Sequence, residues 1–269
     1  MVWNGLEWSG IEGYSADWGS MRNTIHKALA SRWTCVVRPY VLILATLIVA
    51  SGLSAAMLAA RWLYTGSSSY RFLLWNLFLA WIPLVSAFAA SAFCAGGRCR
   101  TISLLVCSGV WLLFFPNAPY ILTDLFHLRV RDNSLFWYDL IMLLSFAWTG
   151  CFLGFVSLNA MQRLIERIVP VRFLGAAMGW ALVIVMAGVS GFGIYMGRFL
   201  RWNSWDMLLR PLSVLGDIWD RIANPLAHNR TFAFSIAFSV FFLVTYLLLT
   251  SFAYLRREQP APNSAAAPR

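Results

Sequence analysis

Apolar residues fill six long stretches of the chain, and charged residues are confined to the segments between them. Each stretch is long enough for the roughly 20 residues that a helix needs to cross a bilayer. Runs that are continuously apolar satisfy their backbone hydrogen bonds in lipid as helices, whereas barrel strands alternate between two faces. The pattern predicts transmembrane helices at residues 39–60, 72–97, 101–123, 140–162, 173–197 and 231–255.

The composition agrees with a membrane protein. Hydrophobic residues make up 60% of the 269 residues and charged residues only 12%, about half the charged fraction of a soluble domain. A water-soluble enzyme is therefore disfavoured. We predict an all-α fold, a polytopic membrane helix bundle with about six transmembrane helices, in one domain over residues 39–255. Residues 1–38 are predicted to be a cytoplasmic or disordered segment, and the Pro/Ala-rich residues 256–269 a disordered tail.

The net charge of +10 reports topology and contact with lipid headgroups more readily than nucleic-acid binding. The side that holds both termini carries twelve Lys and Arg residues, and the other side carries nine. Lys and Arg favour the cytoplasmic side, so both termini are predicted to be cytoplasmic and the protein to be a multi-pass protein of the cell membrane. The bias is small because the predicted outer loop 198–230 is rich in Arg.

Two prolines interrupt the third predicted helix within the sequence FPNAPYILTDLFHL. Pro116 and Pro119 flank Asn117, and each proline removes a backbone donor and disfavours helix in the residue before it. The helix is expected to kink or break there. Asp124 and His127 follow, three residues apart, which places them on one face of a continuing helix.

A second polar segment, GRFLRWNSWD, follows the fifth predicted helix. Arg198 and Arg201 are three residues apart, and the polar and aromatic residues Trp202, Asn203, Ser204, Trp205 and Asp206 come next. Asn203 or Ser204 could simply cap a new helix that starts at Trp205, with Asp206 in its first turn. Asp139 stands at the outer end of the fourth helix, and if it faces the bundle we expect it to pair with Arg198 or Arg201.

These motifs resemble those of an uncharacterised family of bacterial multi-pass membrane proteins, a domain-of-unknown-function group. The resemblance covers roughly residues 71–254 and rests on FPNAPYILTDLFHL, on WYDL in the fourth helix and on GRFLRWNSWD. It implies a membrane protein in which the polar residues form one shared feature, and it supplies no activity. The candidate ligand-binding residues are Asn117, Tyr120, Asp124, His127, Asp139, Arg198, Arg201, Trp202, Asn203, Ser204 and Asp206.

The favoured interpretation of this polar cluster is a structural or ligand-binding role at the outer face. Arg198 and Arg201 would pair with Asp124, Asp139 or Asp206, and the ligand would be an anionic lipid or a lipid-linked anion, because the Arg fork suits phosphate and carboxylate groups. The lipid bilayer is the expected partner, and the oligomeric state stays open. The glycine pairs Gly150/Gly154, Gly175/Gly179 and Gly193/Gly197 indicate close helix packing.

Two alternatives remain. The broken third helix around Asn117 could form the substrate gap of a transporter for a small solute. A membrane-embedded hydrolase or transferase could hold a divalent metal at Asp124, His127, Asp139 and Asp206, although no HExxH helix is present. The balance leans away from an enzyme, and no cofactor is predicted.

Overall fold

The computed structural model describes residues 37–94, 101–128, 135–202 and 204–258, and the side chains of this set up to residue 252. Predictions for residues 1–36, for Asn203 and for the tail 259–269 lie outside the described residues. The described chain is helical and contains no strand. Its elements are the 3₁₀ helix η1 (Arg38–Tyr40), α2 (Val41–Thr65), α3 (Phe72–Cys94), α4 (Thr101–Phe114), α5 (Asn117–Tyr120), the 3₁₀ helix η2 (Ile121–His127), α6 (Phe136–Ile168), α7 (Arg172–Phe199), α8 (Asp206–Leu209), α9 (Pro211–Ala223) and α10 (Asn229–Glu258).

Six helical segments of the described chain are long and apolar enough to cross a membrane. They are Arg38–Thr65, Phe72–Cys94, Thr101–His127, Phe136–Ile168, Arg172–Phe199 and Asn229–Phe252. The predicted all-α bundle with six membrane-spanning helices is confirmed, because each apolar stretch forms the helix that lipid requires of it.

Several helices run beyond the predicted limits. The prediction ended each helix where the apolar run ends, but the backbone continues to bond internally through polar residues at the membrane surface. Helix α2 continues to Thr65, where Gly66 adopts the left-handed conformation (φ 65°) that commonly ends a helix. Helix α6 spans Phe136–Ile168, which places Asp139 in its first turn and Arg167 in its last. Helix α10 continues to Glu258, so the predicted tail begins inside a helix.

The segment 198–230 is more ordered than the predicted outer loop. Helix α8 starts at Asp206, one residue after the expected start, and helix α9 occupies Pro211–Ala223. Pro211 stands in the first turn of α9, where proline is well tolerated because its missing N–H would be unpaired in any case. The new helix considered after the fifth span is therefore present as α8, and the outer loop contains a second helix, α9, that was not predicted.

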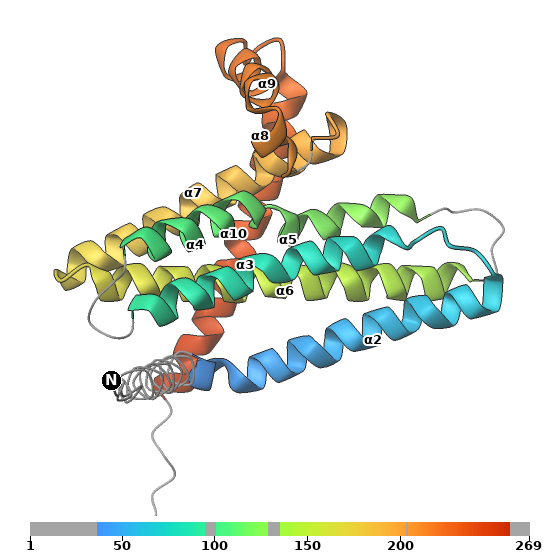
Figure 1. The fold of residues 1–269 in the computed structure, drawn as a ribbon, viewed down its shortest axis with the longest axis horizontal. Helices are drawn as coiled ribbons and strands as arrows, with labels where there is room; N and C mark the ends of the chain where they lie inside the picture. The colour runs from blue at the N-terminus through green and yellow to red at the C-terminus, as the bar shows by residue number, and fades with distance from the viewer. Residues whose placement is uncertain (1–36, 95–100, 129–134, 203, 259–269) are drawn as a thin grey trace, which may run out of the picture.

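Helices α3 and α6 form the centre of the bundle. The most apolar window of each is mostly buried inside the protein, at 61% and 67%, compared with 17% for α2 and for α10. Helix α2 runs along one side of α6, and α8 and α9 project from the opposite side of the molecule (Figure 1). The large side chains at the centre, Trp111, Phe115, Phe146 and Tyr246, are fully buried. Polar groups beside this centre are therefore held on a rigid, well-packed support.

A buried polar network that no sequence motif predicted joins α6 to α10 and η1. Tyr246 donates from its hydroxyl to Gln162 Oε1 at 2.6 Å, and Asn159 donates to the Tyr246 hydroxyl at 3.4 Å. Tyr40 donates to Asn159 Oδ1 at 3.1 Å. In lipid these groups have few other partners, so their mutual bonds help to fix the register of the three elements.

Candidate functional site

The third membrane segment is broken where the two prolines predicted it. Helix α4 ends at Phe114, the short α5 covers Asn117–Tyr120, and η2 continues as a 3₁₀ helix to His127. Asn117 donates from its side-chain amide to the Phe114 carbonyl at 3.1 Å, and Phe115 accepts from the backbone N–H of Ala118. The carbonyl groups that the break exposes are thus satisfied locally, as a bilayer environment demands.

Glycines on α6 and α7 allow the broken segment to pack closely between these helices. A Cβ atom at Gly150 would lie 2.7 Å from Ile121 Cδ1, and one at Gly193 would lie 3.0 Å from the Cβ of Pro116. Gly197 is equally close to the Tyr120 ring, 3.0 Å away. The predicted role of the glycine pairs in packing is therefore seen here. Within the described residues the break is a tightly packed joint, which gives no support to a substrate gap around Asn117.

Asp124 lies at the centre of a polar cluster that joins α3, η2 and α7. Its carboxylate accepts a hydrogen bond from Asn76 Nδ2 at 2.7 Å, lies 3.8 Å from Arg198 Nη1 and lies 3.9 Å from His127 Nδ1. Arg198 Nη2 is also 3.4 Å from His127 Nδ1. The Asp124 side chain is only 2% exposed, whereas those of Arg198 and His127 are 17% and 41% exposed. The two basic side chains therefore stand between the buried carboxylate and the surface.

A second Arg–Asp pair joins α2 to α6. Arg61 donates from Nε to Asp139 Oδ1 at 2.6 Å and from Nη2 to Asp139 Oδ2 at 3.0 Å, a bidentate arrangement. The Arg61 guanidinium also stacks over the Tyr70 ring at 4.5 Å. Asp139 was expected to pair with Arg198 or Arg201, and this expectation was wrong because α6 turns Asp139 toward α2. We call the membrane end that holds this pair and the Asp124 cluster the Arg61 end.

The two Arg–Asp pairs differ in the distance between guanidinium and carboxylate and in the exposure of their side chains. The Arg61–Asp139 pair has two short hydrogen bonds and little exposure of either side chain, 10% and 3%, which is the geometry of a structural clasp. Arg198 approaches Asp124 no closer than 3.8 Å, beyond hydrogen-bond distance. Its guanidinium instead lies 5.2 Å from the ring of Phe126, which is 85% exposed. The Asp124 carboxylate therefore lies near Arg198 but does not accept a hydrogen bond from its guanidinium donors.

Besides the Arg198 contacts, two side-chain hydrogen bonds of Trp202 and Ser204 connect the described part of the GRFLRWNSWD segment to other elements. Asn117 Nδ2 lies 2.9 Å from the Ser204 hydroxyl, and Trp202 donates from Nε1 to Asp217 Oδ2 of α9 at 2.7 Å. The residue before α8 is Trp205, and among the described residues no side-chain capping bond is seen at the start of that helix. The capping role considered for Ser204 is thus not observed, because its hydroxyl bonds to Asn117 instead.

The remaining predicted residues are placed around this core. Tyr120 packs its ring against Gly197. Arg201 is exposed and adopts a left-handed backbone conformation (φ 60°) just after α7, and it makes no ion pair with the described acids. Asp206 is half-buried at the start of α8. The structure thus brings together Asn117, Tyr120, Asp124, His127, Arg198, Trp202 and Ser204, and it places Asp139 in a separate pair.

The described residues contain no group of three or more His, Cys, Asp or Glu side chains that could hold a metal ion. Asp124 and His127 lie close together, but Asp139 is occupied by Arg61. The four candidate ligands of the metal alternative are therefore not gathered at one point in this structure.

Sequence reasoning missed two members of the site region. Arg61 was expected only to contribute to topology, and Asn76 was not among the candidate residues, yet Arg61 holds Asp139 and Asn76 holds Asp124. A signal was present for Asn76, because it is the one side-chain amide in the apolar run 72–97. Burying an amide in lipid is costly unless it has a hydrogen-bond partner.

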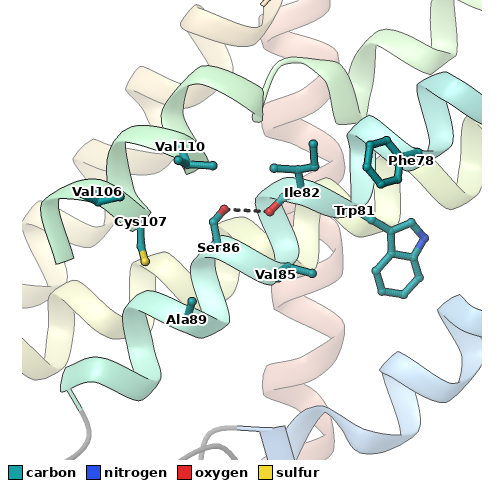
Figure 2. A pocket seen from close by; sticks show the side chains of 9 residues that line it. All are labelled: Phe78, Trp81, Ile82, Val85, Ser86, Ala89, Val106, Cys107 and Val110. Atoms are coloured by element: carbon teal, nitrogen blue, oxygen red, sulfur yellow. Dashed lines mark hydrogen bonds between the residues drawn. The ribbon is translucent and has the colours of Figure 1, made fainter. Parts of the chain in front are cut away.

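An apolar groove of about 420 Å³ lies between α3 and α4. Figure 2 shows Phe78, Ile82, Val85 and Ala89 of α3 along one wall and residues of α4 along the other. The Ser86 hydroxyl bonds to the carbonyls of its own helix. Asn76 falls on a different face of α3 by helical spacing, so the groove is a lipid-facing seam apart from the polar cluster.

The fold defines the class: this is a multi-pass helical membrane protein with a buried acid and two basic side chains at one end of its bundle. Residues 75–245 match the family described as protein of unknown function DUF1361, and the chain belongs to that family. The resemblance to a family of unknown function is thereby confirmed at the level of the family. No curated protein and no solved structure matches the chain.

Proposed function

We propose that the protein binds an anionic lipid, or an anion linked to a lipid, through Arg198 and His127 at the Arg61 end of the bundle. The observation that carries this proposal is the contrast between the two Arg–Asp pairs. Arg61 is closed onto Asp139 at 2.6 and 3.0 Å, whereas Arg198 stays 3.8 Å from Asp124. An Arg that has a nearby carboxylate but no hydrogen bond to it retains donors for an external anion.

The chemistry of the cluster suits a phosphate group. The guanidinium offers planar, paired N–H donors that match phosphate oxygens, and a protonated His127 would add a further donor. Asp124 compensates part of the positive charge when no ligand is bound, and Asn76 fixes that carboxylate from the opposite side. Phe126, exposed beside Arg198, supplies apolar surface next to the charge, as a lipid ligand requires.

The location of the cluster supports a ligand that comes from the membrane. Arg198 is in the last turn of α7, and His127 ends the third membrane segment. Both side chains therefore stand near the end of the apolar part of the bundle, where lipid phosphates lie. Contacts made there gain strength because the local dielectric constant is lower than in bulk water.

Native mass spectrometry of the detergent-purified protein, loaded with a phosphatidylglycerol and phosphatidylcholine mixture, tests the proposal. Arg198→Gln is expected to lower retained phosphatidylglycerol about tenfold, the loss of one charged hydrogen-bonding group. Arg230→Gln is the matched control, because Arg230 is exposed near the same end and makes no ion pair with the described acids. If Arg198→Gln retains as much phosphatidylglycerol as the wild type, the proposal is contradicted.

Asp124→Asn separates ligand binding from a purely structural ion pair. If Arg198 serves an external anion, removing the competing carboxylate leaves phosphatidylglycerol retention equal to or higher than that of the wild type. If the cluster only stabilises the fold, Asp124→Asn and Arg198→Gln destabilise the protein alike, and neither changes the ratio of phosphatidylglycerol to phosphatidylcholine. A parallel unfolding measurement on the same samples distinguishes the two results.

A further inference from the structure

Helix α9 carries an apolar stripe along one side. Within the helix, apolar residues recur at spacings of three and four, the pattern of one helical face. The exposed leucines before and after the helix continue the same spacing. We use the name stripe for the residues Leu208, Leu212, Leu215, Trp219, Ile222 and Leu226. Each of these residues is between 51% and 93% exposed, so no other described part of the chain covers them.

The opposite side of α9 is attached to the protein. Val214 and Arg221 are buried, and Asp217 accepts the hydrogen bond from Trp202 Nε1 at 2.7 Å. Within the helix itself, Arg221 donates to the Asp217 carbonyl at 2.7 Å. On a helical projection these three residues lie roughly opposite the stripe. The attachment fixes the rotation of α9, and the stripe therefore faces away from the protein.

The helix is tied to the membrane surface on both sides. It follows α7 and precedes α10, two membrane-spanning segments, and only residues 200–210 and 224–228 separate it from them. In Figure 1, α8 and α9 project beside the ends of these two helices. The exposed apolar residues of the stripe are therefore close in sequence to both spanning helices. Phe199 at the end of α7 and Trp205 before α8 are also exposed.

We propose that α9 is an interfacial helix whose stripe inserts into the boundary between headgroups and acyl chains on the side of the Arg61 end. Four exposed apolar residues on α9, with Leu208 and Leu226 exposed just before and after it, match the anatomy of such helices, and a Trp within the stripe suits this depth. The charged residues of α9 itself are two acids and one Arg. Anionic lipid therefore provides no special attraction, and burial of apolar surface drives the contact.

This inference goes beyond the anion site and stands without it. The anion site requires a phosphatidylglycerol-type headgroup and depends on Arg198. The stripe engages any fluid phospholipid and depends on Leu212, Leu215 and Trp219. The two ideas can therefore fail separately when the lipid composition is varied.

Photo-crosslinking of the full-length protein in phosphatidylcholine vesicles tests the inference. Benzoylphenylalanine is introduced in place of Leu215 on the stripe, or in place of Ser213, which is exposed on the polar side of the same helix. Intact-mass analysis after irradiation is expected to show a protein–phospholipid adduct for the Leu215 position, at least about fivefold more abundant than for the Ser213 position. Adding phosphatidylglycerol to the vesicles is expected to leave this ratio unchanged.

Three outcomes of the crosslinking experiment would overturn the inference. A covalent dimer from the Leu215 position shows that a second copy of the chain covers the stripe. Equal lipid adducts at both positions, or none at either, show that the stripe does not select the bilayer.

Amide hydrogen exchange in phosphatidylcholine nanodiscs gives a second readout. The double variant Leu212→Glu/Leu215→Glu is expected to exchange about tenfold faster across residues 211–223, with Ser213→Glu as control, and unchanged exchange in the double variant contradicts the inference.

Discussion

The side-chain amide of Asn117 donates a hydrogen bond to the hydroxyl of Ser204, 2.9 Å away. The first residue lies in the break of the third membrane segment, and the second lies between α7 and α8. The bond thus joins the two polar motifs of the sequence through residues that are 87 positions apart in the chain. Because Trp202 in turn bonds to Asp217 of α9, the broken segment, the end of α7 and the surface helix form one connected unit.

The Asn117–Ser204 contact should be measurable as a coupling energy. In a double-mutant cycle with Asn117→Ala and Ser204→Ala, we expect a coupling of about 0.6 kcal/mol and at most about 1.7 kcal/mol, the range for side-chain hydrogen bonds in membrane bundles. Equilibrium unfolding in mixed micelles gives the four free energies. A cycle of Asn117→Ala with Ser213→Ala serves as the control and should show no coupling. A Ser204 coupling equal to the Ser213 value would disprove the contact.

The Arg61–Asp139 clasp should contribute to stability far more than exposed arginines do. Arg61→Gln leaves the buried Asp139 carboxylate without its cation, and we expect a loss of about 3–5 kcal/mol in the free energy of unfolding. Arg61→Lys should recover only part of this loss, because an ammonium group cannot bond both carboxylate oxygens in the fork geometry. Arg71→Gln, at an exposed position nearby, is the control and should lie within about 0.5 kcal/mol of wild type. An Arg61→Gln value in that same range would contradict the clasp.

Two glycines three residues apart on α7 should respond oppositely to alanine. A Cβ at Gly191 would clash with the backbone oxygen of Ser235 on α10, whereas a Cβ at Gly188 meets nothing within 4 Å. Gly191→Ala must push the two helices apart, and we expect it to destabilise the protein by about 1–3 kcal/mol. Gly188→Ala should be neutral or stabilising by up to about 1 kcal/mol, because alanine favours helix. Thermal unfolding in detergent compares the pair, and equal midpoints would refute the close α7–α10 approach.

The end of α9 should show a pH dependence that originates in Asp220. Hydrogen bonds from the Asn224 side chain at 3.1 Å and from His228 at 2.9 Å hold the pKa of the Asp220 carboxyl below its usual value. A depressed folded-state pKa stabilises the fold above the unfolded-state pKa, and this contribution is lost as the pH falls through the folded-state pKa. Carboxyl ¹³C chemical shifts followed against pH would measure the effect. Asn224→Ala should raise the Asp220 pKa, and Asn229→Ala, at an exposed position, should not.

Local sequence signals predicted the helices well, since lipid imposes a simple rule on the backbone. Every apolar run formed a membrane-spanning helix, and Pro116 and Pro119 broke the third segment as expected. In the segment 198–230, a helix start near Trp205 was considered and α8 lies there, whereas α9 was not predicted. The apolar residues of α9 are too few to cross a bilayer, so hydropathy alone does not mark it, and only their spacing of three and four indicates a surface helix.

The sequence by itself therefore determined the class of protein, the six spans, the broken segment and the set of polar residues in the two motifs. Only the tertiary structure decided which of them meet. Arg61 and Asp139 are 78 residues apart, and their pairing depends on how α2 is rotated against α6. Asp124 meets Arg198 because glycines on α6 and α7 let the broken segment approach both helices. Hydropathy and proline effects act within a few residues, whereas pairing between helices depends on packing across the whole bundle.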